Sequence, residues 1–241
     1  MSNQKKIYQI IGIIIAVLVL VLIMLWYYQS QGILRIFPTK EDREIKSALK
    51  IDRSKFKPAQ GLTNEQFEAK IKELTEQKDI VLKNTKDPNA WFSFGKTKEF
   101  LNDHQGAVLA WEIAHKLQPY DFRTLYSMAW VYQYFLKDFV KAENYYREVL
   151  ALQPDYTMAY DGLMDIYRYN IKEKRINFEA LVLEAIQKDK GNEAKYYYAL
   201  VDFFLSEETQ NLDKAKEYLE KLKEKDPKKA SELITANPNL Q

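Results

Sequence analysis

The sequence predicts an all-α protein in which one transmembrane helix is followed by a short solenoid of three to four helix-turn-helix repeats. Two observations predict this architecture. Residues 7–28 carry no charged side chain, and from residue 88 onward large residues, small residues and prolines recur along the chain. The recurrence has a period near 34 residues, which is typical of helix pairs that stack into a solenoid. We therefore expect a membrane anchor and a repeat domain.

The segment 7–28 has the length and the ends of a membrane-spanning helix. At 1.5 Å per residue, about 22 residues cover a hydrocarbon core of about 30 Å. Tyr8 stands near one end, and Trp26, Tyr27 and Tyr28 stand at the other. Amphipathic rings prefer the two membrane interfaces. We expect the lipid bilayer to contact the protein through this segment.

A cleaved signal peptide is the alternative interpretation, because Lys5 and Lys6 precede the apolar run. The run is longer than the usual apolar region of about 7–15 residues, and its far end is bulky. Only Ser30-Gln31-Gly32 offers a weak cleavage site, and the chain has no cysteine to carry a lipoprotein lipid. The sequence favours an uncleaved single-pass anchor.

Basic residues next to the apolar run predict its orientation. Lys5 and Lys6 lie in the N-terminal flank, residues 1–6, directly before the run, whereas the first basic residue beyond it is Arg35. Basic side chains favour the cytoplasmic side. We therefore expect a cytoplasmic N-terminus and an extracytoplasmic repeat domain, although Lys and Arg occur on both sides.

Residues 29–62 form a basic juxtamembrane linker in this interpretation. Pro38, Pro58 and Gly61 interrupt it, and residues 35–57 hold eight basic and four acidic side chains. Helix-breaking residues this close together argue that the segment does not fold as a separate domain. We expect a spacer.

Residues 63–87 predict a leading helix that caps the repeat domain. Thr63 and Gln66 have the spacing of a capping box. One face carries four apolar residues, namely Phe67, Ile71, Leu74 and Val81. The terminal repeat of a solenoid needs a cover with a polar outer side. We expect this helix to be that cover.

The repeat pattern is clearest between Pro88 and Pro119. Measured from Trp91, the steps of 3, 4, 16, 20, 23 and 28 fall on Phe94, Gly95, Ala107, Trp111, Ala114 and Pro119. This spacing resembles the tetratricopeptide repeat family. The resemblance implies two antiparallel helices, with small residues such as Gly95 and Ala107 allowing the close approach that large rings fill.

The resemblance covers residues 88–227, with the first two copies regular and the last two degraded. The second copy gives Leu125, Met128, Ala129 and Tyr132, then Phe139, Ala142, Tyr146 and Pro154, with one extra residue placed in the turn. The third gives Tyr160, Leu163, Met164 and Tyr167, and a late second helix with Phe178, Leu181 and Ala185. The fourth gives Tyr198, Val201, Leu205, Leu212, Ala215, Leu219 and Leu222, with Asp202 at the small position. The tail 228–241 is expected to add a short helix or to fray.

In this family the first helix of each pair lines a concave groove, so the resemblance implies a protein or peptide partner there. The outward positions predict a groove of Phe92, Lys96, Tyr126, Trp130, Tyr134, Asp165, Arg168 and Tyr169. Glu99, Gln133, Asp161, Tyr197 and Phe204 occupy further outward positions. Phe92 stands where chaperone-docking members carry the first clamp lysine, so we do not expect a chaperone tail as the ligand.

No catalytic, cofactor-binding or metal-binding pattern occurs in the sequence, so we expect neither enzyme activity nor a cofactor. The two histidines, His104 and His115, have no third ligand at a suggestive spacing. We expect His104 to be a packed ring and His115 to face solvent.

The charge balance argues against nucleic acid as a partner. The chain holds 36 basic and 34 acidic side chains, and subtracting Lys5 and Lys6 leaves 34 of each beyond the anchor. A neutral domain lacks the electrostatic footprint of nucleic-acid binding. The leading hypothesis is a membrane-anchored scaffold or adaptor. The alternatives are an import receptor on a cytosolic organelle face and a secreted repeat protein released by signal cleavage.

Overall fold

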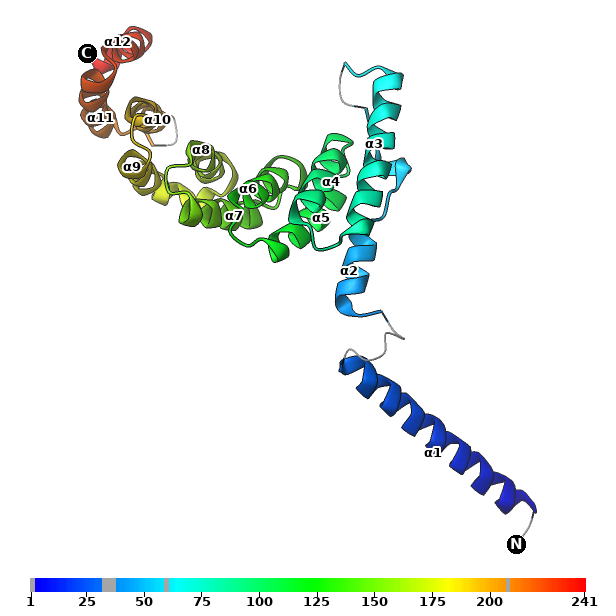
Figure 1. The fold of residues 1–241 in the computed structure, drawn as a ribbon. Helices are drawn as coiled ribbons and strands as arrows, with labels where there is room; N and C mark the ends of the chain where they lie inside the picture. The colour runs from blue at the N-terminus through cyan, green and yellow to red at the C-terminus, as the bar shows by residue number, and fades with distance from the viewer. Residues whose placement is uncertain (1–2, 32–37, 59–60, 207–208) are drawn as a thin grey trace. The chain divides into compact units, whose positions relative to one another are not determined.

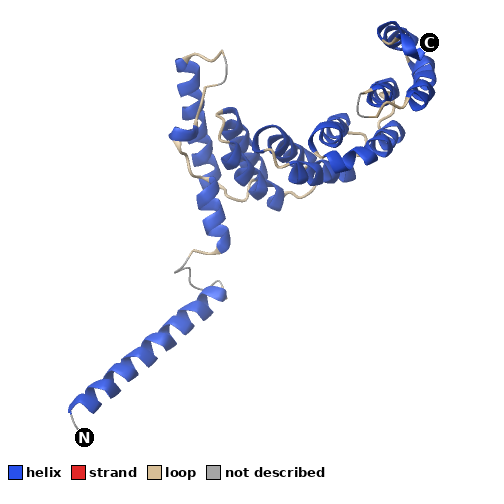
Figure 2. Cartoon of the chain, turned by 180° about the vertical axis from the view of Figure 1, so that it is seen from behind, coloured by secondary structure: helices blue, strands red, loops and turns tan. Residues whose placement is uncertain are grey.

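The computed structural model describes residues 3–31, 38–58, 61–206 and 209–241. It divides into two compact units, residues 1–50 and residues 51–241. Arg35 and Gly32 lie outside the described residues. All regular structure in the described part is helical, with no strand (Figure 2). The predicted all-α class is therefore confirmed.

The first unit contains α1 (Asn3–Ser30) and α2 (Lys40–Ala48). Within α1, Ile7–Ser30 has a mean hydropathy of 3.1 and is long and apolar enough to cross a membrane. A signal sequence near the N-terminus can also meet this criterion of length and composition. Thr39 begins α2 with a capping box, in which its side chain accepts from the Asp42 amide and Asp42 accepts from the Thr39 amide.

The second unit begins with a short 3-10 turn, Arg53–Lys55, and the long helix α3 (Asn64–Lys83). The capping box predicted at the start of α3 is confirmed, because Thr63 and Gln66 exchange hydrogen bonds of 3.0 and 3.2 Å. Ile71, Leu74 and Val81 are buried, and Phe67 is half-buried. The apolar face of α3 packs against α4.

Four helix pairs follow α3 and stack in order along the chain (Figure 1). The pairs are α4 (Pro88–Phe100) with α5 (His104–Leu117), α6 (Phe122–Val131) with α7 (Phe139–Leu152), α8 (Thr157–Asp165) with α9 (Phe178–Lys188), and α10 (Glu193–Leu205) with α11 (Leu212–Lys225). The tail forms α12 (Pro227–Ala236) and a last 3-10 turn, Pro238–Leu240. We call the surface formed by α4, α6, α8 and α10 the first-helix face.

Aspartates set the helix starts of the first two pairs. Asp87, Asp103, Asp121 and Asp138 cap α4, α5, α6 and α7, each accepting hydrogen bonds from backbone amides of the first turn. A carboxylate at this position satisfies orphan donors and complements the helix dipole. These caps explain why the helices begin where the repeat spacing places them.

Trp111 fills the space between α4 and α5, as the spacing predicts. The ring is buried, and a Cβ on Gly95 would lie 2.3 Å from its indole nitrogen. That nitrogen donates a hydrogen bond of 3.1 Å to the Phe92 carbonyl. Because no side chain fits between them, the α4–α5 distance depends on glycine at this position.

The turn between α4 and α5 contains a buried ion pair. Lys98 Nζ lies 2.8 Å from Asp103 Oδ2, and both side chains are buried. Burial is the main cause of a lowered Lys98 pKa, which the Asp103 carboxylate opposes. Asp103 also caps α5, so this pair joins the turn to the helix start.

The extra residue of the second copy lies in the helix and not in the turn, which corrects the sequence prediction. Residues Tyr132–Leu136 form a π-helical segment that continues α6, and Ile166–Asn170 form another that continues α8. A π segment absorbs one residue without breaking the helix. The third copy also contains the 3-10 segment Lys172–Asn177, which delays α9.

The predicted register of the fourth copy is wrong in the first helix, where Tyr196 and not Tyr198 is fully buried, whereas Ala215, Leu219 and Leu222 of the second helix are buried as predicted. Tyr198 and Leu212 are both 37% exposed, whereas Leu200, Val201 and Phe204 are buried. Asp202 therefore does not occupy the small core position, and its carboxylate pairs with Arg168 at 2.6 Å. Three apolar residues in a row, Ala199 to Val201, left the helical phase ambiguous in the sequence.

Replacing Gly95 by alanine should destabilise the repeat unit. The added methyl group would overlap the Trp111 ring, and overpacking of this kind costs about 1–3 kcal/mol. For a chain of this size, we expect a melting temperature lower by roughly 2–10 °C in thermal unfolding followed by circular dichroism. Ser93→Ala, on the exposed side of α4, is the matched control and should leave the melting temperature unchanged. An unchanged transition in Gly95→Ala would contradict this packing.

Candidate functional site

The predicted groove residues lie along the first-helix face, but their environments differ. Of the eight, Lys96, Tyr134 and Tyr169 are exposed, and the other five are half-buried, namely Phe92, Tyr126, Trp130, Asp165 and Arg168. Tyr169 is the most accessible of the aromatic members, at 61% exposed. Half-burial of the other rings leaves part of each available for contact with a partner.

Two residues that the sequence predicts to face outward are buried. Gln133 is 2% exposed and accepts a hydrogen bond of 2.8 Å from the Tyr146 hydroxyl. Phe204 is 7% exposed and stacks on Tyr218, with ring centroids 5.9 Å apart. Gln133 lies in the π-helical segment, which rotates the end of the first helix relative to regular α-helical phase. Phe204 is misplaced because of the register shift in the fourth copy.

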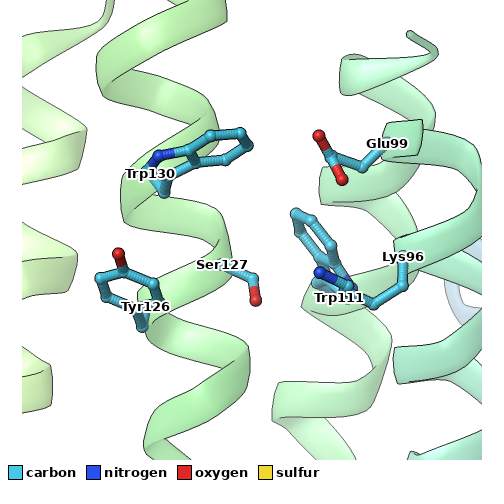
Figure 3. A pocket seen from close by; sticks show the side chains of 6 residues that line it. All are labelled: Lys96, Glu99, Trp111, Tyr126, Ser127 and Trp130. Atoms are coloured by element: carbon cyan, nitrogen blue, oxygen red, sulfur yellow. The ribbon is translucent and has the colours of Figure 1, made fainter. Parts of the chain in front are cut away.

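Part of the face forms a pocket between the first two repeats. It has a volume of about 200 Å³ and is lined by Lys96, Glu99, Trp111, Tyr126, Ser127 and Trp130 (Figure 3). We call these six residues the groove pocket. Lys96, Tyr126 and Trp130 were predicted as groove residues and Glu99 as an outward position. Trp111 was assigned to the core, and Ser127 was not identified. The core aromatic residue Trp111 forms part of the pocket wall, although its side chain is only 1% exposed.

The rings of the groove pocket are held by contacts behind it. Trp130 packs edge to face on Phe135 at 5.0 Å between ring centroids, and Tyr126 packs on Tyr156 at 5.3 Å. The Tyr126 hydroxyl lies 3.6 Å from the Met158 sulfur. Since aromatic neighbours fix these rings, the pocket exists without a ligand.

Further along the face, charged residues of neighbouring repeats pair with each other. Tyr134 donates a hydrogen bond of 3.1 Å to Asp165, and burial with this contact raises the pKa of Tyr134 to about 12. Arg168 pairs with Asp202 at 2.6 Å, and Lys195 pairs with Asp161. Burial also raises the pKa of Asp165. These pairs join α6 to α8 and α8 to α10.

Phe92 lies outside the groove pocket. Its ring packs at 6.4 Å from Trp111, and the guanidinium of Arg123 lies 5.5 Å from its centroid. In chaperone-docking members a clamp lysine on the first helix would supply a cation at the position of Phe92. Here the cation next to that position is Arg123, which comes from α6. Arg123 was not identified as a surface residue from the sequence.

Neither of the two histidines lines the groove pocket. His104 stacks on Phe135 at 3.8 Å between ring centroids, as expected of a packed ring, and burial lowers its pKa. His115 is half-buried with its Nδ1 enclosed, so the expectation that it faces solvent is wrong. Among the described residues, no group of three histidine, cysteine, aspartate or glutamate side chains is placed to hold a metal ion.

Comparison with known proteins agrees with this geometry. A sequence model described as a tetratricopeptide repeat matches residues 122–156, which contain α6, the first π segment and α7. No curated protein matches the chain in sequence.

Solved structures share the fold at low sequence identity. The structure titled MamA RS-1 ArsTM double mutant has a TM-score of 0.53 at 22% identity, covering 66% of this chain and 86% of that one. A crystal structure of MamA has a TM-score of 0.53 at 16% identity, covering 70% of this chain and 98% of that one. The chain therefore contains a tetratricopeptide repeat at residues 122–156, and its fold is similar to that of these solved structures.

Proposed function

We propose that this protein is a membrane-anchored scaffold or adaptor that binds a protein or peptide partner on its first-helix face and performs no catalysis. The observation that carries the proposal is the accessible aromatic face, which presents Tyr126, Trp130, Tyr134 and Tyr169 on successive first helices. Tyrosine and tryptophan are enriched at protein interfaces because they bury a large area and lose few rotamers. Since fold alone does not fix function, the argument rests on this surface.

The anchor part of the proposal rests on α1. None of its apolar window is buried by other parts of the protein, and its isoleucine, leucine and valine side chains are about half exposed. Apolar side chains left in water cost about 25 cal/mol per Å². A bilayer removes that cost, and it can accept α1 because the backbone groups in the interior of a helix are paired within the helix.

The absence of catalysis is proposed from how the charged groups are used. Asp161, Asp165 and Asp202 each bond to a side chain of the face, as described above. A catalytic site needs groups that converge on one reacting position. These pairs are spread along several helices, so they stabilise the packing of neighbouring repeats instead.

The orientation of the anchor distinguishes the proposed scaffold from a cytosol-facing import receptor. We propose that residues 1–6 are cytoplasmic and that the repeats are extracytoplasmic, because the basic pair Lys5 and Lys6 directly precedes the apolar run. A receptor for imported cargo would need the repeats in the cytosol. Ser231 is exposed on α12 and the chain has no cysteine, so Ser231→Cys provides a single site for labelling.

Alkaline extraction and membrane-impermeant labelling should test the anchor. We expect the full chain to stay in the membrane pellet with its N-terminus uncleaved, because α1 spans the bilayer. In intact cells, the Ser231→Cys variant should react with an impermeant maleimide. Release into the soluble fraction as a shortened chain would support the secreted alternative, and labelling only after lysis would support the cytosolic receptor.

Truncating the aromatic face should abolish partner binding. Interface aromatics contribute about 1–2 kcal/mol or more each, so Tyr126→Ala with Trp130→Ala should weaken binding at least roughly 30-fold. The measurement is the amount of partner that co-purifies with the full chain from its own membranes in detergent. Val140→Ala with Glu148→Ala, at exposed positions of α7, is the matched control and should retain the partner. Equal recovery with both double variants would contradict the proposal.

A further inference from the structure

Two tryptophans and one carboxylate converge in the groove pocket. Trp111 comes from α5 of the first repeat and Trp130 from α6 of the second. Figure 3 shows the carboxylate of Glu99 directed towards the space between the six-membered rings of these two tryptophans. The faces of aromatic rings carry negative potential, so rings beside a carboxylate favour a cation.

Glu99 differs from the other carboxylates of the first-helix face. Asp161, Asp165 and Asp202 each have a bonded partner, whereas no side chain of the described residues lies within bonding distance of the Glu99 carboxylate. Glu99 is half-buried, and burial raises its pKa, an effect that the Lys96 charge opposes. The pocket therefore holds a partly desolvated negative charge, on which Lys96 acts through space without an ion pair between them in the described structure.

The pocket is also preformed, which lowers the cost of binding. Trp111 is fixed against Gly95 and by its hydrogen bond of 3.1 Å to Phe92, and Trp130 is fixed against Phe135. Binding to rings that are already ordered costs little side-chain entropy. A long aliphatic stem with a charged end matches a pocket lined by aromatic rings and a carboxylate.

We infer that the groove pocket accepts a lysine or arginine side chain of the bound partner, with its stem along the Trp130 ring and its cationic end on Glu99. This inference rests on the proposed function and specifies the chemistry that the first-helix face selects. Lys96 lines the same pocket with the opposite charge. Its side chain is exposed, so water screens it, whereas Glu99 is half-buried and its charge acts more strongly on a bound group.

Fluorine resonances of the full chain in detergent micelles offer a direct test. 5-Fluorotryptophan gives four resonances, since the chain has four tryptophans, Trp26, Trp91, Trp111 and Trp130. Trp91 is fully buried and Trp26 belongs to α1, so both serve as internal references. The probes are acetylated tripeptide amides, Gly-Xaa-Gly, in which Xaa is lysine, arginine, norleucine or glutamate, titrated at constant ionic strength.

We expect the lysine and arginine tripeptides to shift the Trp111 and Trp130 resonances saturably and to bind about fivefold more tightly than the norleucine tripeptide. The glutamate tripeptide should bind more weakly than norleucine. In Glu99→Gln, the preference for the basic tripeptides over norleucine should fall to within about twofold. Lys96→Gln, the matched control in the same pocket, should keep or increase that preference.

Three results would overturn the inference: tighter binding of the glutamate tripeptide, an unchanged basic preference in Glu99→Gln, or no saturable shift with either basic tripeptide. The proposed function can survive each of them. If Tyr126→Ala with Trp130→Ala loses the natural partner while Glu99→Gln keeps it, the first-helix face binds the partner and the pocket chemistry is wrong. If neither variant loses the partner, both proposals fail.

Discussion

The contact between Trp111 and Gly95 is the interaction on which the first repeat and its pocket both depend. The indole occupies the place where any larger residue on α4 would project, so glycine sets how closely α4 and α5 approach. The same indole donates to the Phe92 carbonyl and contributes to the groove pocket. One ring therefore fixes the spacing of a helix pair and forms part of the surface offered to a partner.

The same principle recurs along the stack with different residues. A Cβ on Gly162 of α8 would lie 2.4 Å from the ring of Tyr146 on α7, so glycine again allows a large ring to sit against a first helix. The Tyr146 hydroxyl donates to Gln133 at 2.8 Å, which holds the π-helical end of the first helix inward. Small residues against large rings thus act both within a repeat and between repeats, and the irregular helix ends adjust to them.

The sequence predicts the parts of the fold that depend on residue type at a fixed spacing. Trp91, Phe94 and Trp111 are buried as the first copy requires, and the helix starts at Thr63 and Pro88 follow from local capping chemistry.

The sequence does not predict features that depend on the phase of the backbone along a helix. The π-helical segment turned Gln133 inward, and a run of apolar residues hid the register of α10. Within the candidate site, outward positions identified Lys96, Tyr126 and Trp130, but the contribution of buried Trp111 to the pocket wall depends on the packing of the next repeat beside it. A contact across repeats is not visible in the spacing of either repeat alone.

The central claim is that the first-helix face, and not the opposite side of the stack, meets the partner at a membrane. The most direct measurement places a photoreactive benzoylphenylalanine at Ser127, in the groove pocket, or at Glu148, on the exposed side of α7, and irradiates intact cells. The account predicts a specific crosslinked adduct from position 127 that fractionates with membranes, and none from position 148. Adducts from position 148 alone, or no adduct from position 127, would contradict it.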